Sequence, residues 1–350
     1  MLKMSPPKLL FVCLFVLVLS SWLAAQVQTA GGRVDVQSIK IPTHNGQWVV
    51  ADLFKPRTAT AESPAPFIVV IPGFQRSKEA LSNIAIELSR RGFVTASIDP
   101  YAQGSSSASL SRIAATTEGY GLFALVDYAA SSTNLNYIDR SRIGATGHSA
   151  GGNAAIRGAN YFGREAARGD GISKLHSVYV SGYVLTLTDE VLRDVRSNVG
   201  VAYALYDEGA YRNEYGDGDM RTAPEALRAV NSGLPGYEAV TAVEIGKYYG
   251  DKNEKTLRIV HNERVLHPFQ PYMAEAIANQ IEYFENVFDR HSELDHYDQV
   301  WQWREILGVI SLIAALAAIV PMGQLLLQTA WFQGLANAIP QSLPRPSGRG

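Results

Sequence analysis

The chain has 350 residues, of which 47% are hydrophobic and 18% charged, and its formal net charge is −2. This length and composition suit one large folded domain with appendages and argue against a disordered chain. Lysine and arginine are scattered along the sequence, so no basic stripe suited to a nucleic-acid backbone is evident, and nucleic acid is not an expected partner. The single cysteine, Cys13, can build neither a disulfide framework nor a thiolate metal site.

The chain begins with an apolar segment. Residues 9–25 carry no charge and follow Lys3 and Lys8, which is the layout of a secretion signal or a membrane anchor. No position near Ala25 fits a small-residue cleavage pattern well. We therefore interpret residues 1–32 as a signal or membrane anchor and prefer the uncleaved anchor.

Strands alternating with helices are predicted next. Residues 34–41 and 48–54 alternate in polarity around His44-Asn-Gly, which predicts an edge hairpin. The apolar run 67–71 predicts a strand buried on both faces. The further expected elements are a helix over 78–91, a strand over 93–98, a helix over about 118–130, strands over 175–184 and 198–206, and a helix from Met273. This alternation of strands and helices predicts a mostly parallel, doubly wound α/β sheet in a domain of residues 33–288.

Residues 147–151 read Gly-His-Ser-Ala-Gly and lie between a predicted strand and a predicted helix. In a G-x-S-x-G turn the glycines let the strand enter the helix so sharply that the serine stands above the sheet on a strained backbone. Ser149 is therefore the candidate nucleophile. A serine nucleophile needs a base, and reactive groups in such sheets gather at the carboxyl ends of the strands.

Two histidines flank the loop after the predicted strand 257–260. His267 stands at the far end of that loop, before the last amphipathic helix, so it can reach back over the sheet. His261 is close enough to the strand to be held in packing. We predict His267 as the general base, with His261 as the alternative.

The base needs an acid that fixes its tautomer. Asp207 directly follows the predicted strand 198–206 and is our candidate. Glu208 beside it and the more distant Asp251 are the alternatives. The resulting order of serine, acid and histidine is the chain order of an α/β-hydrolase triad.

Backbone amides should bind the developing oxyanion of an acyl-transfer reaction. One candidate is the amide of Ala150, at the start of the helix after the serine. The other should come from the loop after strand 67–71, where Phe74 is our choice and Gln75 the alternate.

Two polar segments resemble metal sites only superficially. Residues 207–219 are rich in carboxylates, and residues 291–296 combine histidines with acidic residues. Neither has the spacing of a calcium loop or a zinc site. We interpret the first as a solvated loop and the second as a polar helix face, and we predict no metal and no cofactor.

A second charge-free run, residues 306–327, follows an amphipathic linker of residues 289–305. It is long enough to cross a bilayer, and Trp303 and Trp331 flank it where interfacial tryptophans are favoured. The lysines of the N-terminus predict a cytoplasmic start. The domain between the two apolar runs would then lie outside the cytoplasm, and the tail 328–350 would return to the inside.

These features together resemble the α/β-hydrolase superfamily, in particular bacterial carboxylesterases and dienelactone-hydrolase-like members. The resemblance covers about residues 33–288 and rests on Phe67-Ile-Val-Val-Ile-Pro-Gly-Phe, Asp99-Pro-Tyr-Ala-Gln-Gly-Ser, Gly147-His-Ser-Ala-Gly-Gly and His267. It implies an α/β-hydrolase fold, a Ser149 nucleophile, a His267 base, an Asp207 acid and a two-step acyl-enzyme mechanism. The family's common His-Gly before the oxyanion loop is Pro72-Gly73 here, which keeps a backbone donor but removes a side chain.

A hydrolase domain joined to a membrane region is also similar to bacterial hydrolases with several C-terminal spans, and that similarity implies a shortened form. The expected function is a membrane-associated serine hydrolase that acts on an ester-type acyl substrate and contacts membrane lipid. The alternatives are a catalytically silent hydrolase-like sensor or partner module and a serine peptidase of the same fold. The sequence specifies neither the acyl group nor the oligomeric state.

Overall fold

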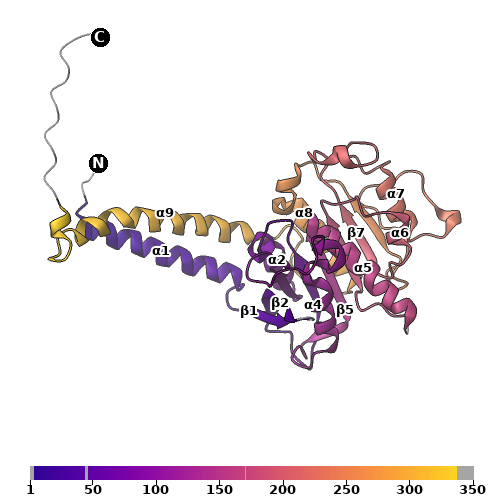
Figure 1. Ribbon diagram of the computed structural model, residues 1–350, viewed down its shortest axis with the longest axis horizontal. Helices are drawn as coiled ribbons and strands as arrows, with labels where there is room; N and C mark the ends of the chain where they lie inside the picture. The colour runs from indigo at the N-terminus through magenta and orange to yellow at the C-terminus, as the bar shows by residue number, and fades with distance from the viewer. Residues whose placement is uncertain (1–3, 44–45, 170, 337–350) are drawn as a thin grey trace, which may run out of the picture. The chain divides into compact units, whose positions relative to one another are not determined.

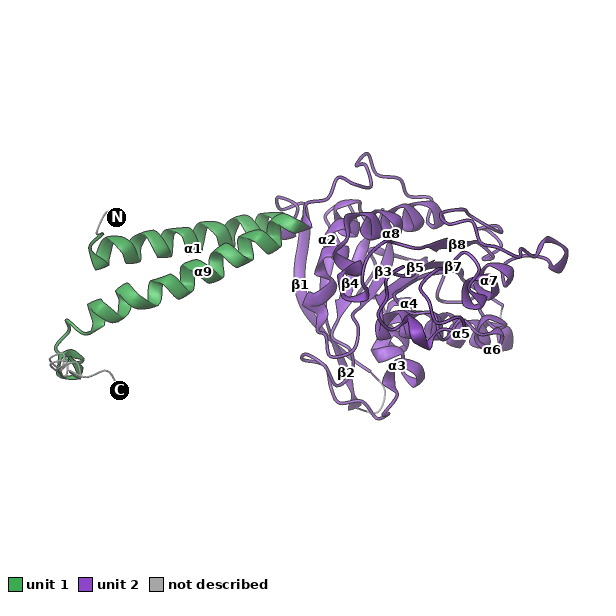
Figure 2. Ribbon diagram, turned by 90° about the horizontal axis from the view of Figure 1, so that it is seen from above, with its two compact units in different colours: residues 1–27, 302–350 green, residues 28–301 purple. Residues whose placement is uncertain are grey.

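The computed structural model describes residues 4–43, 46–169 and 171–336. The chain divides into two compact units, one of residues 28–301 and one that joins residues 1–27 to residues 302–350 (Figure 2).

The larger unit is built on a sheet of eight strands in the order β1-β2-β4-β3-β5-β6-β7-β8 (Figure 1). The strands are β1 (Val34–Pro42), β2 (Trp48–Pro56), β3 (Ala65–Ile71), β4 (Val94–Ile98), β5 (Ile138–His148), β6 (Ser177–Ser181), β7 (Asn198–Ala202) and β8 (Arg258–His261). The pairs β1–β2 and β2–β4 are antiparallel, and the other neighbours are parallel. The prediction of a mostly parallel sheet is confirmed.

Helices cover both faces of this sheet. The long helices are α2 (Ser82–Arg90), α4 (Leu122–Ser131), α5 (Ala150–Arg168), α7 (Pro224–Asn231) and α8 (Ala274–Val287), and the short ones are α3 (Ala114–Thr117) and α6 (Asp189–Leu192). Figure 2 shows α2 and α8 on one side of the sheet and α3, α4, α5 and α6 on the other.

The central strand β3 explains why both faces are covered. All of its residues are buried, and successive side chains point to opposite faces because a strand has a period of two. Val69 joins a core with side chains of α4, α5 and α7, whereas Val70 joins a second core with side chains of α2 and α8. The apolar run in the sequence therefore reflects burial on both sides.

Several elements differ from their predicted lengths. The helix expected over 78–91 begins with a 3₁₀ turn, Lys78–Leu81, before α2. The strand expected over 175–184 ends at Ser181, because Gly182 follows with a φ of +65°, which is incompatible with an extended strand. The strand expected over 198–206 ends at Ala202, after which the chain forms only scattered backbone bonds with residues 261–265.

The strands flanking the predicted hairpin pair in antiparallel register from Val34–Pro56 to Pro42–Trp48. His44 and Asn45 of its turn lie outside the described residues, as do residues 337–350 of the tail. The polar helix face expected over 291–296 is wrong, because residues 289–300 form turns and irregular backbone. The last long helix begins at Trp301, inside the linker predicted over 289–305.

The smaller unit consists mainly of two apolar helices, α1 (Pro6–Gln28) and α9 (Trp301–Leu326), which run antiparallel to each other (Figure 1). The Ser20 and Ser311 hydroxyls hydrogen-bond at 2.8 Å. Large apolar side chains of both helices are mostly exposed, whereas the small residues Cys13, Ala314 and Ala318 are buried. Small residues with a polar bridge are typical of helix pairs in membranes.

Both helices are long and apolar enough to cross a membrane, by length and composition alone. A helix rises 1.5 Å per residue, so the 23 residues of α1 extend about 35 Å, against a bilayer core of about 30 Å.

Candidate active site

Ser149 occupies the turn between β5 and α5 with φ 58° and ψ −121°. A positive φ is costly for a residue with a side chain and persists only where the surroundings hold it. Here β5 lies between β3 and β6, and the Ser149 amide donates to the Ser181 carbonyl at 2.8 Å. The strained turn predicted for the serine is present.

The two flanking glycines are required by close backbone contacts. A Cβ added to Gly147 would lie 2.3 Å from the carbonyl oxygen of Gly151, and a Cβ on Gly151 would lie 2.0 Å from the carbonyl oxygen of Ile71. These distances are far below any tolerable contact, and the obstacles are main-chain atoms that cannot rotate away. The helix can therefore start this close to β3 only with glycine at both positions.

Asp207 and His267 form a hydrogen-bonded pair at the carboxyl ends of the strands. His267 begins a 3₁₀ helix, His267–Tyr272, and its Nδ1 lies 2.8 Å from Asp207 Oδ2. Burial would raise the pKa of the Asp207 carboxyl, but hydrogen bonds from His267 and from the Gly209 amide lower that pKa below its usual value. The aspartate is thus held in its charged form beside the imidazole.

Backbone hydrogen bonds hold the two loops together. The amide of Leu205 donates to the Glu263 carbonyl at 2.7 Å, and the amide of Tyr206 donates to the Val265 carbonyl at 3.2 Å. These bonds extend the contact between β7 and β8 beyond the regular ladder. They bring Asp207 next to His267 although it lies beyond the end of its strand.

The alternative residues lie elsewhere. The buried His261 is in contact with the Tyr179 hydroxyl, 2.9 Å from its Nδ1, and burial lowers the pKa of its imidazole to about 4. Glu208 accepts the backbone amide of His267 at 3.2 Å. Asp251 accepts the amide of Asn253 in a turn before β8, at the opposite end of that strand. Of the candidates, the structure brings His267 and Asp207 together.

The loop after β3 runs directly beside Ser149. A Cβ added to Gly73 would lie 3.2 Å from Ser149 Cβ, so the main chain passes at close range. In the described part of the chain, the amides of Phe74, Gln75 and Ala150 have no acceptor. Amides from both sides of Ser149 are thus free to bind a ligand oxygen, and on the β3 side those of Phe74 and Gln75 are both available.

The segment that begins at Asp99 holds the loop after β3 in place through hydrogen bonds. Asp99 is buried and accepts the amides of Lys78 at 2.8 Å and Ser105 at 2.9 Å. Gln103 Oε1 accepts the amide of Arg76 at 2.8 Å. A carboxylate that accepts several amides holds a loop in one conformation. The Asp99 segment therefore fixes the backbone next to Ser149 without entering the site.

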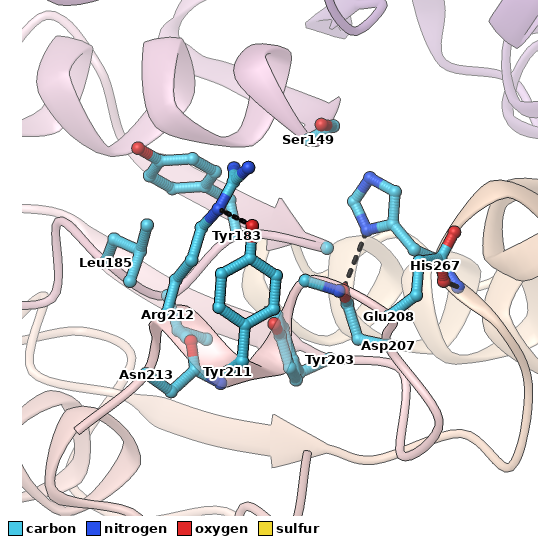
Figure 3. Close-up of a pocket in the computed structure, with 13 residues that line it drawn as sticks. Ser149, Tyr183, Leu185, Tyr203, Asp207, Glu208, Tyr211, Arg212, Asn213 and His267 are labelled. Atoms are coloured by element: carbon cyan, nitrogen blue, oxygen red, sulfur yellow. Dashed lines mark hydrogen bonds and ion pairs between the residues drawn. The ribbon is translucent and has the colours of Figure 1, made fainter. Parts of the chain in front are cut away.

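Two cavities meet at Ser149 and His267. One has a volume of about 280 Å³, and the other, of about 220 Å³, lies toward Phe74 and Tyr272. The first cavity is lined by Ser149, Gly182, Tyr183, Val184, Leu185, Tyr203, Asp207, Glu208, Gly209, Tyr211, Arg212, Asn213 and His267. Figure 3 shows that the His267 nitrogen not bonded to Asp207 lies on the side of the ring that faces Ser149.

His148, which directly precedes Ser149, is a site residue for which no role was predicted from the sequence. Its ring packs against the His267 ring, with 4.5 Å between centroids. Burial, followed by the nearby His267, lowers the pKa of the His148 imidazole to about 3. A neutral ring therefore supports the face of His267, and its position next to Ser149 in the sequence was the available signal.

The acidic loop expected to be solvated pairs its carboxylates with arginines. Glu214 forms an ion pair with Arg228, and Asp219 forms one with Arg221. Among residues 4–43, 46–169 and 171–336, no group of three or more His, Cys, Asp or Glu side chains is arranged to hold a metal ion.

Comparison with solved structures identifies the class of fold. The chain is similar to the Pyrococcus furiosus esterase, with 11% identity, a TM-score of 0.50, and coverage of 74% of this chain and 94% of that one. Weaker likenesses are to the Anabaena variabilis dienelactone hydrolase (13% identity, TM-score 0.46, 75% and 100% covered) and to a dienelactone hydrolase-like promiscuous phosphotriesterase from metagenomic libraries (15%, 0.49, 74% and 99%). The chain has the α/β-hydrolase fold.

Residues 22–171 match the PETase family, described as PET hydrolase-like. The matched region contains Ser149 and the loop of Phe74 and ends before Asp207. No curated protein matches the chain. The family match indicates that the chain is a carboxylic ester hydrolase.

The pairing of Asp207 with His267 predicts a pH-dependent contribution to stability. A carboxyl whose pKa is lower in the folded state stabilises the fold above its unfolded pKa, about 3.9, and loses that contribution as the pH falls through the folded pKa. We expect the thermal midpoint of Asp207→Asn to lie below that of wild type at neutral pH, and the gap to narrow below about pH 4. His267→Ala should also weaken the acid dependence. Equal pH dependence of wild type and Asp207→Asn would contradict this account.

Proposed function

We propose that the chain is a membrane-anchored serine hydrolase that cleaves carboxylic esters through Ser149, His267 and Asp207. In this proposal Ser149 is the nucleophile, His267 the general base and Asp207 the acid that fixes the histidine tautomer. The hydrolase domain lies outside the cytoplasm. Domain boundaries follow the same proposal, with residues 33–288 as the hydrolase and the apolar segments on either side as membrane anchors.

Acylation begins when the substrate carbonyl carbon lies next to Ser149 Oγ. His267 Nε2 takes the hydroxyl proton as Oγ attacks, and Asp207 stabilises the resulting imidazolium through the Nδ1 hydrogen bond. The oxyanion accepts hydrogen bonds from the backbone amides of Ala150 and Phe74. His267 then gives its proton to the departing alkoxide, which leaves as the alcohol and yields an ester on Ser149.

Deacylation repeats these steps with water as the nucleophile. His267 removes a proton from water, the resulting hydroxide adds to the acyl carbon, and the same amides hold the oxyanion. Collapse of the intermediate breaks the bond to Ser149 Oγ, which regains a proton from His267. The products are the free enzyme and a carboxylic acid.

One observation carries the proposal, namely the charged Asp207 hydrogen-bonded to the His267 ring whose other nitrogen faces the cavity with Ser149. A strained Ser149 conformation costs stability, and such strain concentrates at functional sites. A silent partner module would need neither the strain nor the buried carboxylate. These features favour an enzyme over a sensor.

The cavity beside Ser149 supports a compact or aromatic acyl group. Its volume of about 280 Å³ is small, and Tyr183, Tyr203 and Tyr211 are among its lining residues. Aromatic side chains pack well against flat rings in offset or edge-on contacts. The family matched by residues 22–171 is named for hydrolysis of PET. We infer that long, flexible acyl chains fit this cavity poorly.

The membrane anchor is supported by the pairing of α1 with α9. Ser20 and Ser311 bond within otherwise apolar helices, where a hydroxyl without a partner would be costly in hydrocarbon. If α1 were cleaved off as a signal peptide, the Ser311 hydroxyl would lose this hydrogen-bond partner. Lys3 and Lys8 precede α1, which favours a cytoplasmic N-terminus. Both helices would contact membrane lipid.

Replacement of the nucleophile should abolish covalent labelling. A fluorophosphonate probe should label the purified full-length wild type in detergent, because an activated serine attacks its phosphorus. Ser149→Ala should show no labelling and lose at least about 10³-fold in ester turnover. The matched control Ser181→Ala, next to the same turn, should keep the label. Absence of labelling in folded wild type would argue for a silent module.

The cavity size predicts a preference among acyl chains. With p-nitrophenyl esters of graded length, kcat/KM should be highest for acetate, butyrate or benzoate. We expect it to fall by at least about tenfold for a sixteen-carbon chain, since an acyl chain that cannot be buried loses roughly 0.8 kcal/mol of binding per CH₂. Highest activity on the longest chain would contradict the proposed substrate class.

The two-span arrangement predicts the location of each segment. In intact cells, added protease should digest the region 33–288 and leave tags at both termini protected. The proposed topology places the hydrolase domain outside the cell membrane and both chain termini in the cytoplasm. After permeabilisation, both tags should become sensitive. A C-terminal tag digested in intact cells, or loss of an N-terminal tag from the mature chain, would rule this topology out.

A further inference from the structure

A second cavity lies at the amino ends of the parallel strands, at the edge of the sheet opposite Ser149. Its volume is about 790 Å³, larger than either cavity at the catalytic edge. Its lining includes six arginine and lysine side chains and one histidine, namely Arg140, Arg142, Lys174, Arg196, Lys255, Arg258 and His176. Among the described lining residues, Glu254 is the only carboxylate.

The topology of the sheet explains this concentration of charge. The strands β5, β6, β7 and β8 are consecutive neighbours and all parallel, so their amino ends meet at one edge. A basic side chain or an imidazole lies near the start of each: Arg142 is in the first half of β5, His176 directly precedes β6, Arg196 lies two residues before β7, and Arg258 is the first residue of β8. Residues far apart in the sequence therefore line one cavity.

Some of these charges are already balanced by carboxylates. Arg142 forms an ion pair with Asp139 at 2.6 Å, and Lys174 pairs with Asp127 at 2.6 Å and Glu165 at 3.3 Å. The remaining cations differ in this respect. Within the described ranges, Arg140, Arg196, Lys255 and Arg258 have no ion-pair partner. Arg140 donates to the Ser132 carbonyl at 2.5 Å.

Arg258 is the least exposed of them, with 2% of its surface accessible. Its Nε donates to the Ser232 hydroxyl at 3.0 Å, and its Nη1 donates to the Ser197 carbonyl at 3.0 Å and the Leu257 carbonyl at 2.9 Å. Its Nη2 has no acceptor in the described structure. Burial lowers the pKa of this guanidinium to about 10, so it remains charged at neutral pH. A buried cation without a counter-charge is costly unless an anion approaches it.

Lys255 adds a second positive charge without an ion-pair partner among the described residues, although the Asp289 carboxylate, which is paired with Lys252, also acts on it. Its ammonium contacts His176 Nε2, and the Nδ1 of that ring lies 2.6 Å from the Ser177 hydroxyl. Burial, followed by the charges of Lys255 and Arg142, lowers the pKa of the His176 imidazole to about 3, so the ring is a neutral acceptor for the ammonium. The lysine is thereby positioned by a neutral group.

We propose that this cavity binds a small, multiply charged oxyanion of the phosphate class, held by Arg258, Lys255 and Arg196. A guanidinium offers paired N–H donors that match the oxygens of a phosphate, and an ammonium contributes a compact point charge. The site is separate from Ser149, because the two cavities lie at opposite ends of the same strands.

The proposal is tested by calorimetric titration of the purified full-length chain in detergent with pyrophosphate and with orthophosphate, at ionic strength held constant with sodium chloride. We expect saturable binding of one pyrophosphate per chain, with orthophosphate weaker. The double variant Lys255→Gln/Arg196→Gln should weaken binding at least tenfold, whereas Lys255→Arg should retain it. Arg112→Gln removes an exposed positive charge that lines no described cavity and should bind as wild type does.

Ester turnover provides the control for folding, since all three variants lie outside the proposed catalytic machinery and should keep the wild-type rate. Absence of saturable binding in an active wild type would overturn the proposal. Equal weakening by Arg112→Gln would also overturn it, because binding would then depend on overall charge. The ester hydrolase function is unaffected by either outcome.

Discussion

The structure depends on one steric constraint, the approach of the first turn of α5 to the backbone of β3. A Cβ on Gly151 would lie 2.0 Å from the Ile71 carbonyl oxygen, so only glycine lets the helix begin there. Ser149 is consequently held at φ 58° above the carboxyl edge of the sheet. The same turn directs His148 beneath the His267 ring and leaves the Ala150 amide free. The two glycines Gly147 and Gly151 thus position the strand β5, the helix α5 and the reactive Ser149.

Parallel topology then divides the sheet into two edges of different chemistry. At the carboxyl edge, backbone bonds between the Asp207 and His267 loops bring an acid and an imidazole together beside Ser149. At the amino edge, basic residues at or near the starts of neighbouring strands gather around a cavity. Each edge collects residues that are distant in sequence, because every parallel strand contributes its start to one edge and its end to the other.

Much of the fold could be predicted from the sequence, since the strand of residues 67–71, the turn at Ser149 and the alternation of strands and helices depend on local composition. Element lengths were less predictable. The pattern could not reveal that Gly182 takes a positive φ and ends β6, or that residues 203–206 leave the ladder. The role of each candidate catalytic residue stays a prediction, although the structure brings Ser149, Asp207 and His267 to one cavity.

By itself, the sequence determined the fold class, the position of the strained serine and the presence of two apolar helices, because glycine spacing and hydrophobic periodicity are local properties. Only the tertiary structure decided which histidine meets which carboxylate. His261 and His267 stand close together in sequence, yet one is buried against Tyr179 and the other reaches Asp207. It also decided that basic residues scattered along the chain meet at one edge, since that convergence comes from strand order, which no local pattern encodes.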